Sequence, residues 1–155
     1  MNPTLTRLHL NNEQISQYDS PYLTTGRKHE TWQINSIEIE HNHLIADISM
    51  CSTYVSATDN NKFHLTIFSA LEFLSQLMII YAHVWAGLGK KSREGWMVES
   101  HTRSIRAVRN PEHIKVEMNV QRMHQRGFNL YCQADYRVTD DQDGLFEVEL
   151  KGFLS

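Results

Sequence analysis

The longest apolar stretch of the chain runs from Phe63 to Gly89, and it contains one acidic residue, Glu72, and no Lys or Arg. A run of this length could cross a bilayer, which takes about 20 apolar residues. A carboxylate in mid-bilayer costs roughly 2.5 kcal/mol or more, and a lone span has no partner helix to offset that cost. The pattern therefore favours a helix buried on nearly all sides within a soluble domain, and no membrane span.

Apolar and polar residues alternate along most of the remaining chain after residue 30, with the period of two that β-strands show. Two such segments precede the apolar helix and four follow it. The alternation changes phase between Ile34 and Ile37, which predicts a bulge. The predicted strands cover residues 31–40, 44–50, 96–108, 114–121, 128–138 and 145–154.

One face of each predicted strand is apolar, which is typical of an antiparallel sheet with one buried face. A long helix against such a sheet gives an α+β fold in a single domain, residues 1–155. Residues 1–30 form an N-terminal extension. Within it, a short helix begins at Asn11 or Asn12 and is ended by Pro21, after which we expect a loop.

Net charge and cysteine content limit the kinds of molecule that the protein is expected to bind and where it is expected to occur. The 155 residues carry a net charge of −3, which disfavours nucleic acid and anionic lipid. Cys51 and Cys132 form neither a CxxC pair nor a disulfide framework, so a reducing, cytoplasmic location is expected. His41 and His43 lie in a predicted turn without a third ligand nearby, so no metal site is predicted.

Several short features of the sequence occur in the order found in one enzyme family. A Pro-Tyr pair ending at Tyr22 precedes the first strand, and a Ser-x-Tyr segment contains Tyr54. His64 lies twelve residues before Gln76, and the chain ends in the hairpin segment "DDQDGLFEVEL". Together with the element order over residues 32–155, these features resemble the FcoT-type long-chain fatty acyl-CoA thioesterases of the hotdog superfamily. That resemblance implies a central helix wrapped by a curved antiparallel sheet.

The family pattern differs at two helix positions. Where the family has an Asn two residues after the His and an Asn just before the Gln, this chain has Thr66 and Ser75. The resemblance therefore implies Tyr22 and Tyr54 as site residues, and Thr66 and Ser75 as site positions with hydroxyls in place of amides.

A second motif resembles another hotdog enzyme. Glu72 and Gln76 form a Glu-x-x-x-Gln motif similar to that of the hydroxyacyl-ACP dehydratases, in which a helix acid works with a loop His. Here His64 lies only eight residues before Glu72, and the proline-rich loop between the two residues is missing.

Glu72 is the first candidate for acid–base chemistry. Burial in an apolar helix raises the pKa of a carboxyl group, which suits a general base working near neutral pH. The alternative is that Glu72 reaches an edge and pairs with a Lys or Arg at a subunit contact. His64 could act as a general acid or base, or position a carbonyl, or be a satisfied loop residue. Eight helical residues span about 12 Å, so His64 and Glu72 are not expected to touch within one chain.

These residues and the resemblance together predict an acyl-thioester hydrolase acting on fatty acyl-CoA or acyl carrier protein. Glu72 activates water directly or through Gln76, while helix-start amides with Tyr54 or Tyr22 stabilise the oxyanion. No cofactor is implied, since coenzyme A or phosphopantetheine is part of the substrate. The candidate catalytic residues are Glu72, His64, Tyr54 and Tyr22; the candidate substrate-binding residues are Thr66, Ser75, Gln76, Phe68, Leu71 and Met78.

Two other functions stay open: a β-hydroxyacyl-thioester dehydratase or hydratase, and a non-catalytic acyl-binding module. Open strand edges predict at least a homodimer, with the site near the interface. Positive residues on the later strands could bind the phosphates of coenzyme A or an acidic carrier protein. They are Arg103, Arg106, Arg109, Lys115, Arg122 and Arg126.

Overall fold

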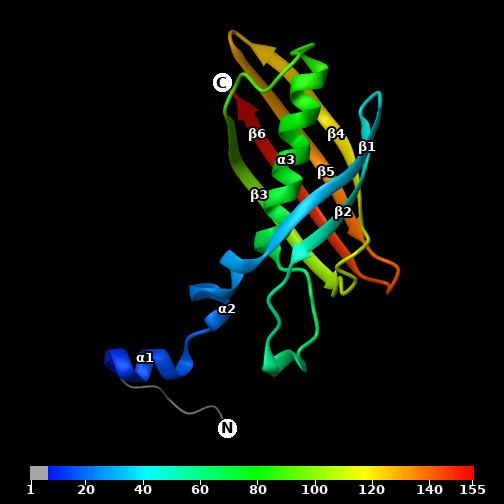
Figure 1. The fold of residues 1–155 in the computed structure, drawn as a ribbon. Helices are drawn as coiled ribbons and strands as arrows, with labels where there is room; N and C mark the ends of the chain where they lie inside the picture. The colour runs from blue at the N-terminus through cyan, green and yellow to red at the C-terminus, as the bar shows by residue number, and fades with distance from the viewer. Residues whose placement is uncertain (1–6) are drawn as a thin grey trace.

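Six antiparallel strands form one curved sheet around a single long helix, α3 (Figure 1). The computed structural model describes residues 7–155. The strand order is β1-β2-β4-β5-β6-β3, so β1 and β3 are the two edges. The elements are α1 (Asn12–Tyr18), α2 (Pro21–Thr24), a 3-10 helix (Gly26–His29), β1 (Thr31–Glu40), β2 (His43–Ser52), a 3-10 helix (Ala57–Asp59), α3 (Ile67–Trp85), β3 (Gly95–Arg106), β4 (Ile114–Arg126), β5 (Asn129–Thr139) and β6 (Leu145–Leu154).

The predicted α+β order is confirmed, and so are several local details. The pairing of β1 with β2 shifts register between Ile34 and Ser36, which confirms the bulge. Asn11 caps α1 and forms a capping box with Gln14. The loop expected after Pro21 is wrong, because Pro21 begins α2 instead. Proline fits the first turn of a helix, where its missing N–H needs no partner.

The core lies between the concave face of the sheet and one side of α3. Phe73, Leu74 and Leu77 are fully buried against it. The Tyr136 hydroxyl on β5 donates to the Leu74 carbonyl oxygen at 3.1 Å, which ties helix to sheet. These contacts fix the rotation of α3 about its own axis. The other residues of the helix therefore have fixed positions relative to the strands.

The expectation that α3 is buried on nearly all sides is wrong. The sheet curls so that both edges, β1 and β3, contact α3, and a gap between them leaves one side of the helix open (Figure 1). Only half of the helix is buried, although its length and composition alone are sufficient to span a membrane. Phe68, near the start of the helix, is 45% exposed, and Val84, near its end, is 57% exposed.

The loop before β4 is braced near the start of α3. The Asp140 carboxylate accepts backbone N–H hydrogen bonds from Arg109, Asn110, Gln142 and Gly144, at 2.7 to 3.0 Å. A Cβ at Gly144 would lie 2.6 Å from the Val108 Cα, so the turn packs directly against this loop. The Val108 carbonyl in turn accepts from the Leu65 N–H, one residue before the cap of α3.

Candidate active site

One aromatic and three polar residues follow one another along the uncovered side of α3. Phe68, Glu72, Ser75 and Gln76 lie at helical spacing, and we call this row the open strip. Glu72 is exposed, so the expected burial of its carboxyl is wrong. Its Oε2 accepts a hydrogen bond from the Trp32 indole Nε1 at 3.0 Å. The indole thus holds one carboxylate oxygen, and the other has no hydrogen-bond partner within residues 7–155.

Trp32 is itself fixed in place by the core. Its ring contacts buried Phe73 edge-on, with centroids 6.0 Å apart. The strand β1 therefore delivers the indole N–H to the open strip from the edge of the sheet. Glu72 and His64 make no hydrogen bond to each other; each is held by different neighbours.

A buried carboxylate, Glu30, lies at the start of α3. Glu30 is 8% exposed, and its Oε2 accepts from the Tyr22 hydroxyl at 3.1 Å and the Ser69 hydroxyl at 2.6 Å. The Tyr22 hydroxyl also lies 2.5 Å from the Thr66 hydroxyl. Since Tyr22 donates to Glu30, Thr66 donates to Tyr22. Burial raises the pKa of Tyr22, so its hydroxyl stays protonated and this network persists at neutral pH.

The structure thus brings together Tyr22 and Thr66, two of the candidate site residues, and adds Glu30 and Ser69. Sequence reasoning missed these two residues. Glu30 and Ser69 are 39 positions apart, and neither belongs to a recognisable motif. Only the tertiary fold, which sets the start of β1 beside the first turn of α3, pairs them.

The second predicted tyrosine packs beside the first. The rings of Tyr22 and Tyr54 have centroids 5.9 Å apart. A Cβ at Gly26 would lie 2.8 Å from the Tyr54 ring, so only glycine lets the ring lie flat on this backbone. Tyr22 also contacts Phe68 of the open strip, at 6.4 Å between centroids, and the Arg27 guanidinium lies 5.6 Å over the Phe68 ring.

His64 belongs to a separate cluster just before the helix. Its Nδ1 lies 2.7 Å from Asp59 Oδ2, and Arg109 contacts the same carboxylate at 3.1 and 3.3 Å. Hydrogen bonds from Arg109 and then His64 hold the pKa of Asp59 below its usual value. The cluster holds the His64 ring through Nδ1, and the side chain is 46% exposed.

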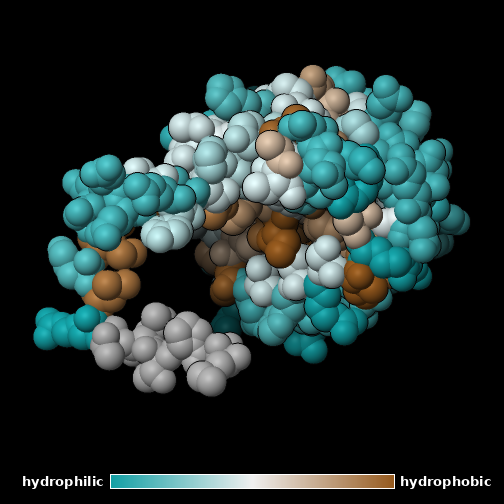
Figure 2. Space-filling view, turned by 90° about the horizontal axis from the view of Figure 1, so that it is seen from below, coloured by the Kyte–Doolittle hydropathy of each residue, from teal (hydrophilic) through white to brown (hydrophobic). Residues whose placement is uncertain are grey.

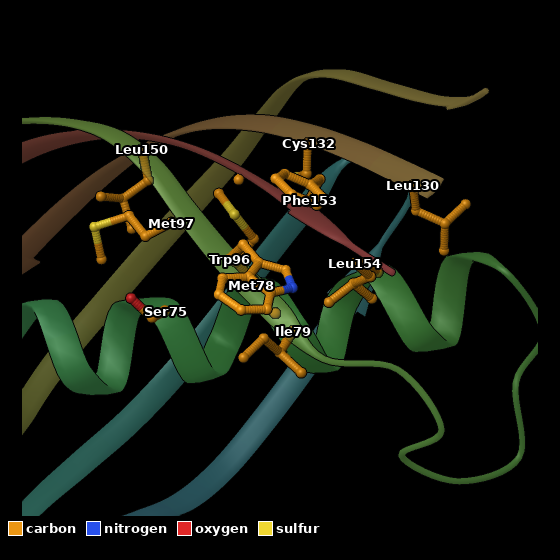
Figure 3. A pocket seen from close by; sticks show the side chains of 13 residues that line it. Ser75, Met78, Ile79, Trp96, Met97, Leu130, Cys132, Leu150, Phe153 and Leu154 are labelled. Atoms are coloured by element: carbon orange, nitrogen blue, oxygen red, sulfur yellow. The ribbon is translucent and has the colours of Figure 1, made fainter. Parts of the chain in front are cut away.

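An apolar pocket lies between α3 and the strands β3, β5 and β6, beside the open strip (Figure 3). Its volume is about 50 Å³. Ser75 and Met78 line it, whereas Phe68 and Leu71 lie outside its lining: Phe68 is at the surface and Leu71 packs against the core. The complete lining is Ser75, Met78, Ile79, Ala82, Gly95, Trp96, Met97, Leu130, Cys132, Leu150, Gly152, Phe153 and Leu154.

One lining residue carries a potentially reactive group. Burial raises the pKa of the Cys132 thiol to about 12. The thiol therefore remains neutral at physiological pH, which makes it a poor nucleophile because the thiolate is the reactive form. Cys132 acts as a small apolar wall of the pocket.

The surface around the start of α3 is hollowed. Figure 2 shows apolar residues gathered in a hollow between two hydrophilic rims when the molecule is seen from the end where α3 begins. Ile67 and Phe68, in the first turn of α3, are 41% and 45% exposed. Apolar side chains left open in this way are typical of a surface that another molecule covers.

Two of the six basic residues proposed to bind phosphates form ion pairs with acidic residues on the sheet. Arg103 pairs with Glu147 and Lys115 with Glu117, and all of the six except Arg109 are exposed. Within residues 7–155, no group of three or more His, Cys, Asp or Glu side chains could hold a metal ion.

Comparisons with known proteins identify the fold. No protein-family model and no curated protein matches the sequence. A thioesterase from Haemophilus influenzae has a TM-score of 0.51 and 10% identity over 96% of this chain and 92% of that one. A Streptococcus mutans protein bound to acetyl-CoA has a TM-score of 0.52 and 12% identity, over 81% of this chain and 90% of that one. A conserved Pseudomonas aeruginosa protein has a TM-score of 0.53 and 13% identity, over 90% of this chain and 98% of that one. The chain has the hotdog fold, which confirms the predicted architecture.

Proposed function

We propose that this hotdog protein is an acyl-thioester hydrolase acting on acyl-CoA, or on the phosphopantetheine arm of a carrier protein. The observation that carries the proposal is the Glu72 carboxylate, oriented by the Trp32 indole and followed three residues later by Ser75 at an apolar pocket. A carboxylate on a rigid helix beside a pocket for the acyl chain is what thioester hydrolysis needs. Similarity in fold to a thioesterase and to an acetyl-CoA-bound protein supports it.

Glu72 takes a proton from water while the water oxygen attacks the thioester carbonyl carbon. The carbonyl oxygen becomes an oxyanion that faces the start of α3, where the first N–H groups of a helix have no partner within the helix. The C–S bond then breaks, and Glu72 returns the proton to the thiolate. The products are a carboxylic acid and free thiol.

Of the two candidate tyrosines, Tyr54 is the better oxyanion donor. The Tyr22 hydroxyl is committed to Glu30 and Thr66, whereas the Tyr54 hydroxyl has no hydrogen-bond partner among residues 7–155. We assign Tyr22 to positioning the first turn of α3, and Gln76 and Ser75 to polar contacts with the thioester. Two unpaired cysteines fit a cytoplasmic protein.

The test is release of free thiol from acyl-CoA, followed with a thiol reagent. Turnover that saturates with substrate supports a hydrolase. Hydration of crotonyl-CoA, seen as loss of enoyl absorbance, identifies the dehydratase instead. Acyl-CoA binding without either reaction identifies a binding module and contradicts the proposal.

Arg27 gives the substrate a direction along α3. It lies over Phe68 at the start of the helix, where Lys28 and His29 follow it and the helix dipole also favours anions. We therefore place the coenzyme A phosphates at this end and the acyl chain toward Ala82. Changing Arg27 to Glu is expected to raise KM for acyl-CoA about tenfold and leave kcat unchanged.

The matched control is the same acyl group on N-acetylcysteamine, which lacks the phosphates. The Arg27→Glu change is expected to leave KM for this truncated thioester unaltered. Equal losses on both thioesters show that Arg27 acts through the fold, and no loss on either shows that the phosphates bind elsewhere.

A second copy of the chain is proposed to cover the open side. The edge strand β3 pairs only with β6, and Val98 and Ile105 on it are 67% and 43% exposed. Light scattering is expected to give twice the 18.1 kDa mass of one chain. The double variant Val98→Lys with Ile105→Lys is expected to give the single-chain mass. The control Ile39→Lys, on the other edge of the sheet, is expected to leave the dimer intact. A single-chain mass for the unaltered protein contradicts the proposal.

A further inference from the structure

The pocket beside the open strip has a mouth and a closed end. Ser75, the next polar residue after Glu72 on this side of α3, lies at one end of the lining (Figure 3). Ala82, Leu130 and Leu154 lie at the other end, where they form a small core cluster with exposures of 1%, 1% and 3%. The seven residues from Ser75 to Ala82 span about 10 Å along the helix. That distance is the upper limit for an acyl chain entering at Ser75, because packed side chains close the pocket beyond it.

The side walls are set by backbone. A Cβ at Gly152 would lie 2.8 Å from the Trp96 carbonyl oxygen and 3.3 Å from the Met78 sulfur. A Cβ at Gly95 would lie 2.7 Å from the Ile79 side chain. At Gly95 and Gly152 the main chain of β3 and β6 therefore lies close to Ile79 and Met78 of α3. A larger residue at either glycine would narrow the pocket.

The volume limits the occupant. The pocket measures about 50 Å³, and a water-sized group needs about 10–15 Å³ on the same scale, so it holds about three to five such groups. A methylene group is similar in size to water. With the carbonyl carbon outside, beside Glu72 and Ser75, the pocket accommodates an acyl chain of about four to six carbons.

We propose that the substrate is a short, unbranched acyl thioester of about four to six carbons, and that Ala82, Leu130 and Leu154 set this length. The inference rests on the proposed function. It departs from the long-chain substrates that the FcoT resemblance implies, because a palmitoyl chain has no room beyond the closed end. Each methylene that enters the pocket is expected to raise kcat/KM about fourfold until the pocket is full.

The experiment measures kcat/KM for straight-chain acyl-CoAs from acetyl to palmitoyl, with binding of the same series by calorimetry. Both are expected to peak between butanoyl and hexanoyl. A preference that rises through decanoyl to palmitoyl, in turnover or in binding, overturns the inference. If no thioester is hydrolysed, the proposed function fails, and the calorimetric series still decides the length.

Variants at the closed end test which residues set the length. Ala82→Leu is expected to move the optimum about two carbons shorter, and Leu154→Ala to move it longer. Val84→Leu changes an exposed residue near the end of the same helix and outside the pocket lining. As the matched control, it is expected to keep the original profile. Melting temperatures confirm that each variant folds; if Ala82→Leu does not fold, Leu154→Ala carries the test. Folded variants that all keep the original optimum overturn the assignment.

Discussion

Replacing Glu72 with Gln is expected to lower kcat for acyl-CoA hydrolysis by about 10²–10⁴-fold, the usual contribution of a general base. The amide still accepts the hydrogen bond that Trp32 donates to Glu72 Oε2. It keeps the shape of the site but cannot take a proton from water. The loss is therefore expected in kcat, with KM and the melting temperature nearly unchanged.

Two controls separate chemistry from structure. Glu99→Gln removes another exposed carboxylate, which pairs with Lys151 on the sheet, and is expected to leave kcat unaltered. Trp32→Phe keeps an aromatic ring against Phe73 but removes the indole N–H, and is expected to cost about tenfold because the carboxylate loses its orientation. Full activity in Glu72→Gln would show that another group activates the water.

Replacing Asp140 with Ala is expected to lower the free energy of unfolding by about 3 kcal/mol or more, measured by urea denaturation. Four backbone N–H groups donate to this one carboxylate. Its removal leaves partly buried donors unpaired and frees the loop that carries Val108 against Leu65. Asp141→Ala, which removes a single contact with the Asn110 side chain, is expected to cost less than about 1 kcal/mol.

The same carboxylate gives a pH dependence. Burial alone raises the pKa of Asp140, but the four backbone hydrogen bonds lower it overall below its ordinary value. A carboxyl with a depressed folded-state pKa contributes stability that is present above its unfolded pKa and is lost as the pH falls through its folded pKa. Part of the acid destabilisation below about pH 4 is therefore expected to disappear in Asp140→Ala. Identical pH profiles for the two proteins would contradict this assignment.

The local pattern of apolar and polar residues predicted the helices and strands well, because this pattern depends only on residues close together in the sequence. Alternation located all six strands, and the phase change at Ile34 located a bulge. The apolar run located α3 within a few residues. The interpretation of the extension after Pro21 was wrong because proline ends some helices and begins others, and only the conformation of the following residues decides which.

The site was only partly predictable. Glu72, Ser75 and Gln76 stood out as polar residues in an apolar helix, and they do share its open side. Glu72 was expected to be buried, but it is exposed. Its burial depends on how far the sheet curls around α3, which the helix sequence does not determine. The contact between Glu30 and Ser69 joins segments with no shared motif, so no sequence pattern could have predicted it.

By itself, then, the sequence determined the order and type of the elements, because helix and strand periodicities are local. It also determined which polar side chains share one side of α3, since helical spacing fixes that. Only the tertiary structure decided that this side stays open, that Trp32 holds Glu72, and that buried Ala82 lines the pocket. These features depend on the curvature of the sheet and on contacts between segments far apart in the chain, and both arise only when the strands have paired.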